Sequence, residues 1–306
     1  MTIKLAQFEE KSSISSIKYA NGLRGRIYKM KVTVVIPVFN RTTFLRSAIT
    51  SVLQQTFQSF EIIVVDDGSN NGKEIQDLAE SFNDERIRYL RKHNGGVASA
   101  LNLGINQMRG EYFAWLSDDD LFNEFHLEIA VTSLSDYKIP SIHFSNWETI
   151  DVAGHKIMEV DADRQLRSLV TDLGPVEQGL ISAISTVISK SVFEVIGTFD
   201  ERLKYVQDYE FFLRAGVRNI PWDFSSYVSA GIRIHKDEAT NFIDSNDNEE
   251  EIFWENLARV GANQIIANNE SKKARELLIQ FRENFQKKEY YSSVNYLDSL
   301  LLRMYK

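Results

Sequence analysis

The chain has 306 residues, a formal net charge of −8 and no cysteine. This length corresponds to one large or two ordinary domains, and 43% apolar residues suffice for a hydrophobic core. The lack of cysteine excludes disulfide scaffolds, cysteine-ligated zinc, iron–sulfur clusters and thiol catalysis, and it suits a reducing compartment.

The charge is unevenly distributed along the chain. Residues 1–31 carry seven basic and two acidic side chains, so the remainder sums to −13. An acidic body argues against a nucleic-acid partner, because phosphate neutralisation needs a basic face. The basic segment either contacts anionic lipid headgroups, at roughly 1 kcal/mol per cation, or is a solvated extension. With no signal-like apolar region and no apolar run of about 18 residues, we expect a cytoplasmic protein, at most peripheral at the inner face of the membrane.

Two runs of β-branched residues, 32–39 and 61–66, predict buried strands. Between them, residues 44–53 have apolar side chains at helical spacing, with Thr42 or Thr43 as the expected N-cap. The alternation continues with a helix over 73–82, a strand over 87–90, a helix over 97–108 and a strand over 112–116. Near-continuous apolar strands separated by helices predict an α/β fold with a doubly wound parallel sheet.

From about residue 141 the spacing of the apolar residues changes. We expect strands over 141–146, 156–160, 185–189 and 227–235, helices over 190–196 and 208–215, and an irregular stretch before about 183. The acidic segment 244–251 is a linker or a helix start, and all that follows has helical spacing. Two apolar stripes mark the last helices, as core or as the face of a homo-oligomer: Leu277, Leu278, Phe281 and Phe285, then Tyr290, Val294, Leu297, Leu301 and Met304.

Acidic and polar residues follow three of the predicted strands, at 39–40, 66–69 and 117–120. Ligands of such sheets bind beyond the carboxyl ends of the strands, so we expect these segments to line one rim. Crowded carboxylates repel each other unless a cation neutralises them, and Mg²⁺ or Mn²⁺ with a nucleotide diphosphate would suit carboxylate oxygens. The alternative for 117–120 is a solvated turn that caps the next helix.

Other common phosphate and hydrolase motifs are missing from the sequence. It has no G-x-x-x-x-G-K-[ST], no G-x-G-x-x-G after the first strand, no G-x-S-x-G and no H-E-x-x-H. The sequence thus gives no support to a P-loop, a nicotinamide or flavin site, a simple serine hydrolase or a zincin.

A series of motifs continues into the second half of the chain. They are Val32–Asn40, Gln54–Phe57, Glu61–Ser69, Asn94–Gly104, Gly110–Asp120, Asp200–Leu203 and Gln207–Phe212. In this order they resemble the family-2 glycosyltransferases of the GT-A fold: the amino-terminal signature, the N-x-G-x-x-x-A-x-N-x-G block, the D-x-D-type segment and the acceptor-side acidic motif. The resemblance covers about 31–236 and implies a GT-A type, mainly parallel sheet with an acceptor-side subregion and a helical C-terminal extension.

The resemblance also implies domains and partners. We expect a basic extension over 1–30, a catalytic domain over 31–243 and a helical region over 244–306, with nucleotide-binding (31–120) and acceptor (121–243) halves in the catalytic domain. The donor would be a nucleotide-diphosphate sugar, with UDP favoured, and the acceptor a glycan or a lipid-linked molecule. The role would lie in surface polysaccharide or glycoconjugate synthesis.

The resemblance assigns roles residue by residue. It implies nucleotide contacts from Pro37, Val38, Phe39, Asn40, Asp67, Asn94, Gly96 and Asp118. Asp119 would ligate Mn²⁺ or Mg²⁺, joined by His235, which is otherwise structural. Leu116 stands where the family often has a further Asp, so the metal need not be essential.

Asp208 is the expected general base of an inverting transfer, which needs one acceptor-side carboxylate to take the hydroxyl proton. A helix N-cap is the alternative role for Asp208, and Glu210 is the nearest competitor as the base.

Two other functions of the chain stay open. One is a catalytically inactive nucleotide-sugar-binding or scaffold protein on the same fold. The other is a sugar-1-phosphate nucleotidyltransferase, which needs a Gly-rich basic first loop that Phe39–Thr43 does not provide.

Overall fold

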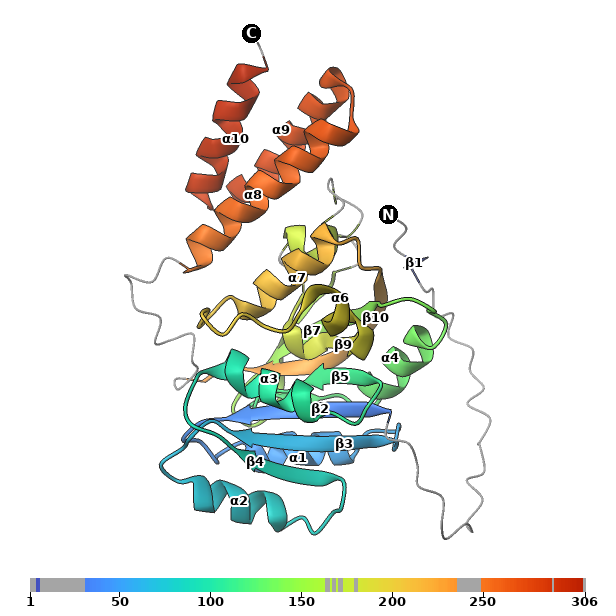
Figure 1. The fold of residues 1–306 in the computed structure, drawn as a ribbon, viewed down its shortest axis with the longest axis vertical. Coiled ribbons are helices and arrows are strands. Elements are labelled where there is room, and N and C mark those ends of the chain that lie inside the picture. Colours follow the sequence, from blue (N-terminus) through green and yellow to red (C-terminus); the bar gives the residue numbers. More distant parts are fainter. Residues whose placement is uncertain are drawn as a thin grey trace.

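A computed structural model describes residues 4–5, 31–162, 166, 169, 173–178, 181–235, 249–287 and 289–304 (Figure 1). Nearly all of the basic segment 1–30 and the first part of the acidic segment, 244–248, lie outside the described residues. Membrane contact through the basic segment therefore stays a prediction. Within the described part of the chain, no helix is long and apolar enough to cross a membrane.

One ten-stranded sheet organises the described residues. Its parallel half consists of β2 (Val32–Val38), β3 (Phe60–Asp66), β4 (Ile87–Arg91) and β5 (Tyr112–Trp115), in the spatial order β5-β2-β3-β4. Beyond β5 follow β9 (Thr186–Ser189), β7 (Ile142–Ile150), β10 (Trp222–Arg233) and β1 (Lys4–Leu5), while β6 (Leu121–Phe122) pairs with β10 and β8 (Lys156–Val160) with β7. Among the central strands only β9 runs antiparallel to its neighbours. The predicted mainly parallel α/β sheet is confirmed.

Helices cover both faces of this sheet because the strand side chains alternate. On β2, Val34 and Ile36 join the core that contains α1 (Leu45–Leu53), α2 (Gly72–Glu80) and α4 (His126–Leu134). Val35 faces the opposite core with α3 (Val97–Gln107), α6 (Lys190–Ile196) and α7 (Gln207–Val217). The strands are therefore buried on both sides, which explains their near-continuous apolar sequences.

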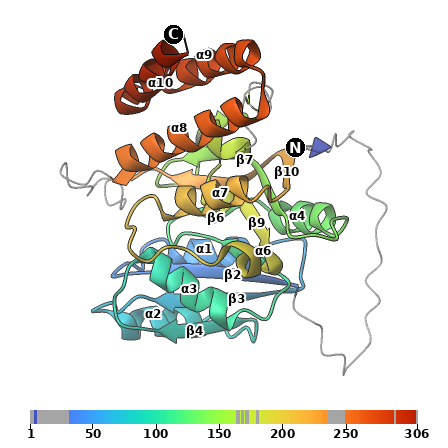
Figure 2. The ribbon, with the colours of Figure 1, turned by 45° about the horizontal axis from the view of Figure 1, so that its top comes forward.

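The C-terminal region consists of α8 (Glu249–Asn268), α9 (Ser271–Lys287) and α10 (Tyr291–Arg303), stacked on the α7 side of the domain (Figure 2). The predicted apolar stripes are core: Phe281 and Leu297 are fully buried, and both belong to the cluster that contains Phe211 of α7. The stripes are thus covered within the chain and give no support to a homo-oligomer face, which stays a prediction.

Some element boundaries differ from the predictions for identifiable reasons. The N-cap of α1 is Phe44 rather than Thr42 or Thr43, and the Thr42 hydroxyl donates to Glu74. Strand β10 begins at Trp222, five residues before the predicted 227, and two register shifts against β7 interrupt its alternation. Residues 121–140, for which no element is predicted, form β6 and α4.

Helix α3 approaches the sheet closely through a glycine. A Cβ atom at Gly104 would lie 2.5 Å from both γ carbons of Val35 on β2, well inside normal contact. We expect Gly104→Ala to lower the free energy of unfolding by about 1–3 kcal/mol, because an added methyl group overpacks a filled core. Chemical denaturation measures this loss. Asn106→Ala, at an exposed position of the same helix, is the matched control and should change stability by less than about 0.5 kcal/mol. Equal stabilities for the two variants would contradict the close packing.

Candidate active site

The candidate site lies at the carboxyl edge of the sheet. Strands β2, β3 and β5 are parallel and end at Val38, Asp66 and Trp115, so the loops that follow them meet at one edge. Strand β10 runs in the same direction, since it is parallel to β7, and it ends at Arg233. The topology therefore brings the end of β10 to the loops of the nucleotide half, as the predicted rim requires.

Asn40 joins the first two of these loops. It has a left-handed backbone (φ 56°), which asparagine tolerates better than most residues. Its amide N–H donates to Ser69 Oγ at 2.8 Å, and its Oδ1 accepts from the Asn70 amide at 2.8 Å. Phe39 beside it is 46% exposed, whereas the side chains of Pro37 and Val38 are buried in β2. Of the predicted first-strand contacts, only Phe39 and Asn40 present side chains to a ligand.

Asp67, in the loop after β3, binds the backbone at the amino end of α3. Its carboxylate accepts the amides of Gly95 and Gly96, the latter at 2.7 Å, and pairs with Lys92 Nζ at 2.7 Å. Asn94 lies on the same loop, and its backbone nitrogen is 2.7 Å from the point where a Cβ of Gly68 would stand, so Gly68 must lack a side chain. The structure thus brings Asp67, Asn94 and Gly96 together, and Asp67 holds the loop that precedes α3.

The acidic loop after β5 contacts the guanidinium of Arg41 and the imidazole of His235. Arg41 forms a double contact with Asp118, from Nη2 to Oδ1 and from Nε to Oδ2, and its Nη1 lies 3.0 Å from Asp119 Oδ2. The same Asp119 oxygen is 3.1 Å from His235 Nε2, 116 residues later in the chain. Burial raises the pKa of Asp118, an effect that Arg41 opposes and that Asp119 reinforces. The predicted neighbours Asp118, Asp119 and His235 do meet.

Asp120, the third acidic residue of this loop, binds the backbone at the end of β10. Its Oδ1 accepts the backbone amide of Arg233, whose Nε donates to the Asp119 carbonyl. The Arg233 guanidinium also donates to the carbonyls of Asp151 and Val152 in the β7–β8 turn. Burial raises the pKa of Asp120, and the charge of Asp119 adds to this rise. Arg233 thereby fixes the acceptor half to the acidic loop.

Asp208 lies in the first turn of α7. This helix leads into β10 through residues 218–221 only, so its amino end points toward the carboxyl edge of the sheet. Burial raises the pKa of Asp208 to about 6, against opposing hydrogen bonds from its own amide and that of Tyr209. Glu210, the competitor, is held by Arg214 in a double contact of 2.7 and 2.8 Å, and Arg214 also binds the carbonyls of Ile196 and Thr198. Glu210 therefore has a structural partner, whereas Asp208 is a carboxylate with raised basicity.

Asp119 and His235 are the residues that could hold a divalent cation. In the part of the chain that the structure describes, no three His, Cys, Asp or Glu side chains form a ready-made metal cluster. A carboxylate oxygen and an imidazole nitrogen 3.1 Å apart nevertheless suit Mn²⁺ or Mg²⁺ when phosphate oxygens and water complete the coordination. The Arg41 cation against the same carboxylates shows that this point of the site attracts positive charge. The donor set fits the metal that the sequence predicts.

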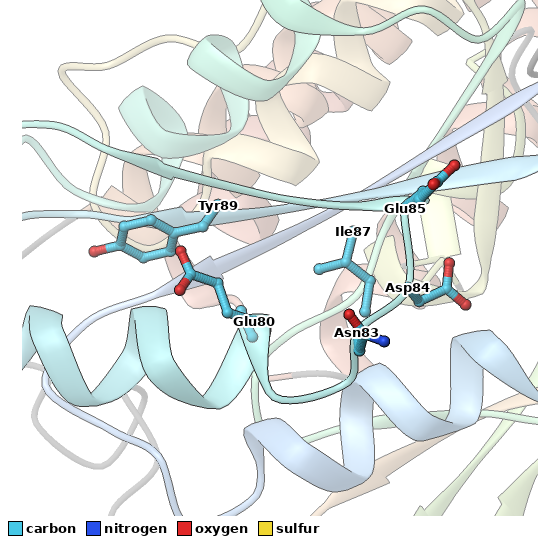
Figure 3. A pocket seen from close by; sticks show the side chains of 7 residues that line it. Glu80, Asn83, Asp84, Glu85, Ile87 and Tyr89 are labelled. Carbon is cyan, nitrogen blue, oxygen red and sulfur yellow. The ribbon is translucent and has the colours of Figure 1, made fainter.

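The pocket shown in Figure 3 lies elsewhere, against edge strand β4 and the end of α2. It has a volume of about 330 Å³ and is lined by Ala79, Glu80, Asn83, Asp84, Glu85, Ile87 and Tyr89. None of these residues belongs to the carboxyl rim, so the hollow and the candidate site are separate.

Sequence reasoning missed two residues of this site, Arg41 and Arg233. Arg41 follows the predicted nucleotide contact Asn40, and Arg233 precedes His235 by two positions. A rim of carboxylates requires cations, so basic residues in the rim loops were the available signal. Their partners, 77 and 114 residues away, could not be read from spacing.

Comparisons with known proteins agree with this geometry. Residues 33–197 match the family model for glycosyl transferase family 2. An uncharacterized glycosyltransferase of Rickettsia typhi is 32% identical over 92% of this chain and 89% of its own length, and one of Rickettsia prowazekii is 36% identical over 76% and 73%. Against a relative of Rickettsia felis, also 36% identical, the chain spans only 38% of that protein's length.

The fold also has solved counterparts. The structure of S. aureus TarS 1–349 superposes on 84% of this chain and 72% of its own with a TM-score of 0.60, at 19% sequence identity. TarS has also been solved in complex with UDP-GlcNAc and with UDP. Because the identity is low, this likeness shows the fold alone, and it confirms the predicted GT-A architecture.

The hold of Asp67 on the loop before α3 can be tested separately from catalysis. Asp67→Asn leaves one acceptor oxygen for the Gly95 and Gly96 amides and removes the charge that faces Lys92, so we expect a loss of about 1–2 kcal/mol in the free energy of unfolding. Urea denaturation measures it. Asp77→Asn, which removes an exposed pair with Lys73, is the matched control and should be near neutral. An Asp67→Asn protein as stable as this control would contradict this role of Asp67.

Proposed function

The chain belongs to glycosyl transferase family 2, and from this premise we propose that it transfers a sugar from a UDP-sugar to an acceptor hydroxyl with inversion at the anomeric carbon. The observation that carries the proposal is the meeting of Asp119 and His235 at the carboxyl edge, 3.1 Å apart, beside the rim loops of the nucleotide half. The UDP and UDP-GlcNAc complexes of TarS, which has the same fold, support uridine as the base.

The nucleotide would lie across the loops that follow β2, β3 and β5. Exposed Phe39 and the fixed Asn40 offer an aromatic face and an amide at the first of these loops. Asp67 is the predicted partner of the base N–H, but its two oxygens already receive Gly95, Gly96 and Lys92. The Gly95 amide contacts both oxygens, so four contacts fill the about four acceptor positions of the carboxylate. The base would therefore replace one donor, and the flexible Lys92 ammonium is the one that can yield. Asp118 would take the ribose hydroxyls.

Asp119 and His235 would hold the metal, with the diphosphate of the donor as the further ligand. When bound there, Mn²⁺ or Mg²⁺ would stabilise the negative charge that develops on the departing nucleoside diphosphate. Arg233 supports both ligands, because it lies two residues before His235 and binds the Asp119 carbonyl through its Nε. The pair is thus fixed in position before any ligand arrives.

Asp208 would act as the general base. The acceptor hydroxyl gives its proton to the Asp208 carboxylate while its oxygen forms a bond to the anomeric carbon, and the bond to the diphosphate breaks. A pKa of about 6 suits this role, because at pH 7 about nine tenths of the carboxylates are ionised and yet more basic than an ordinary Asp. The acceptor would be a glycan or a lipid-linked molecule, used in surface polysaccharide or glycoconjugate synthesis.

Removal of the Asp208 carboxylate tests the mechanism. We expect Asp208→Asn to lower kcat for transfer by about 10²–10⁴-fold, the usual contribution of a general base, while UDP affinity by calorimetry stays near that of the wild type. Glu210→Gln is the matched control, since Glu210 is engaged by Arg214, and it should affect stability more than turnover. Full turnover by Asp208→Asn would refute the assignment. Failure of the wild-type chain to bind UDP at all would favour a scaffold protein.

The pH dependence of turnover follows from the raised pKa. Because Asp208 must be ionised to accept a proton, kcat/KM should fall about tenfold per unit as the pH drops below about 6. The kcat/KM for the acceptor, measured between pH 4.5 and 8, checks this. The residual activity of Asp208→Asn should lack the acidic limb. A limb that persists unchanged in this variant would assign the titration to another group.

A further inference from the structure

Arg41 places a positive charge between the carboxylates of Asp118 and Asp119. Its guanidinium contacts Asp118 through Nε and Nη2 and Asp119 through Nη1, so one positive group bridges two carboxylates. The Asp118 and Asp119 side chains are only 4% and 12% exposed, and Arg41 is 34% exposed at the mouth of the site. Two nearly buried like charges require such a neutralising partner.

The contact of Arg41 with Asp119 uses the oxygen that a metal would need. Nη1 of Arg41 lies 3.0 Å from Asp119 Oδ2, and His235 Nε2 lies 3.1 Å from the same atom. A divalent cation bound between Asp119 and His235 would sit against this oxygen and beside the guanidinium, where two cations repel strongly. The Arg41 ion pair and a metal would therefore compete for the same Asp119 oxygen.

The neighbouring residue fixes where Arg41 emerges. Asn40 is held in its left-handed conformation by hydrogen bonds with Ser69 and Asn70, so the backbone at this point cannot shift easily. The long arginine side chain is the part that can move. Its partial exposure gives it a way out to solvent without disturbing the core.

We propose that Arg41 is an internal placeholder for the divalent cation, which must displace it from Asp119 to bind. The inference rests on the proposed function, since it concerns the metal of that site. It has two consequences. Without Arg41 the carboxylates are free, so a metal binds more tightly. Without Arg41 and without metal, the two carboxylates lose the cation that bridges them, so a nucleotide diphosphate binds less tightly.

Binding measurements on Arg41→Ala test both consequences without any turnover. Free Mn²⁺ is titrated by electron paramagnetic resonance in the absence of nucleotide, and UDP is titrated by calorimetry in EDTA. We expect Mn²⁺ affinity to rise about tenfold and UDP affinity in EDTA to fall about tenfold, within the usual range for coupled sites. Saturating Mn²⁺ should restore most of the UDP affinity.

Arg46→Ala is the matched control, because it removes the same charge from an exposed residue of α1 that contacts Ser81 and Phe82. It should leave both affinities within about twofold of the wild type. Arg41→Met, which keeps the aliphatic stem, replaces Arg41→Ala if thermal unfolding shows that the latter is not folded. A supporting role for Arg41 would instead weaken Mn²⁺ binding when it is lost.

Unchanged or weaker Mn²⁺ binding by the Arg41 variants overturns the inference, and so does a failure of every chain to bind Mn²⁺. The proposed function is judged independently, by hydrolysis of UDP-sugars by the wild-type chain. A chain that shows the Mn²⁺ difference but hydrolyses no donor would contradict the proposed function and support the placeholder. If the wild-type chain hydrolyses a donor while Arg41→Ala binds Mn²⁺ like the wild type, the proposed function is supported and the placeholder role of Arg41 is contradicted.

Discussion

The crowding of Asp118, Asp119 and Asp120 at the end of β5 is the constraint on which the site depends. Three carboxylates this close destabilise the fold unless positive or polar groups reach each of them. Arg41 reaches the carboxylates of Asp118 and Asp119 from the loop after β2, and the backbone amide of Arg233, at the end of β10, donates to the carboxylate of Asp120. The guanidinium of Arg233 binds the Asp119 carbonyl. These contacts tie the nucleotide half to the acceptor half.

The C-terminal helices contact the loop before α7 and the first turn of α7, the turn that carries Asp208. Glu249, the first residue of α8, accepts the backbone amides of Lys204 and Tyr205 in the loop that leads to α7. Tyr209 packs its ring 5.5 and 5.8 Å from the rings of Phe253 and Trp254. These contacts hold the loop before α7 and the first turn of α7 against the helical region. The helical region therefore positions the amino end of α7, which carries Asp208, besides adding core.

The sequence predicts elements with local signals well in both halves. In the nucleotide half, β2 and β3 differ from their predicted bounds by one residue, since buried parallel strands read as continuous apolar runs. In the acceptor half, strand β8 and helix α6 match their predicted bounds. The meeting of Asp119 with His235 agrees with the roles that the family resemblance implies. The Arg41 ion pairs do not, because they join two loops whose paths no periodicity encodes. The start of β10 is missed for a similar reason, since its bulges break the alternation that marks a strand.

The same electrostatics connects stability with function. Burial raises the pKa of Asp118, Asp120 and Asp208, which means that the folded chain holds these groups less readily as anions than the unfolded chain does. For a carboxyl group raised in this way, the stabilising contribution is largest at low pH, where both states are protonated, and declines as the pH rises through the window between the two pKa values. Burial therefore disfavours negative charge on the loop after β5. Arg41 favours that charge at Asp118 and Asp119 through its ion pairs, and any cation that binds there with a nucleotide has to offer more than Arg41 does.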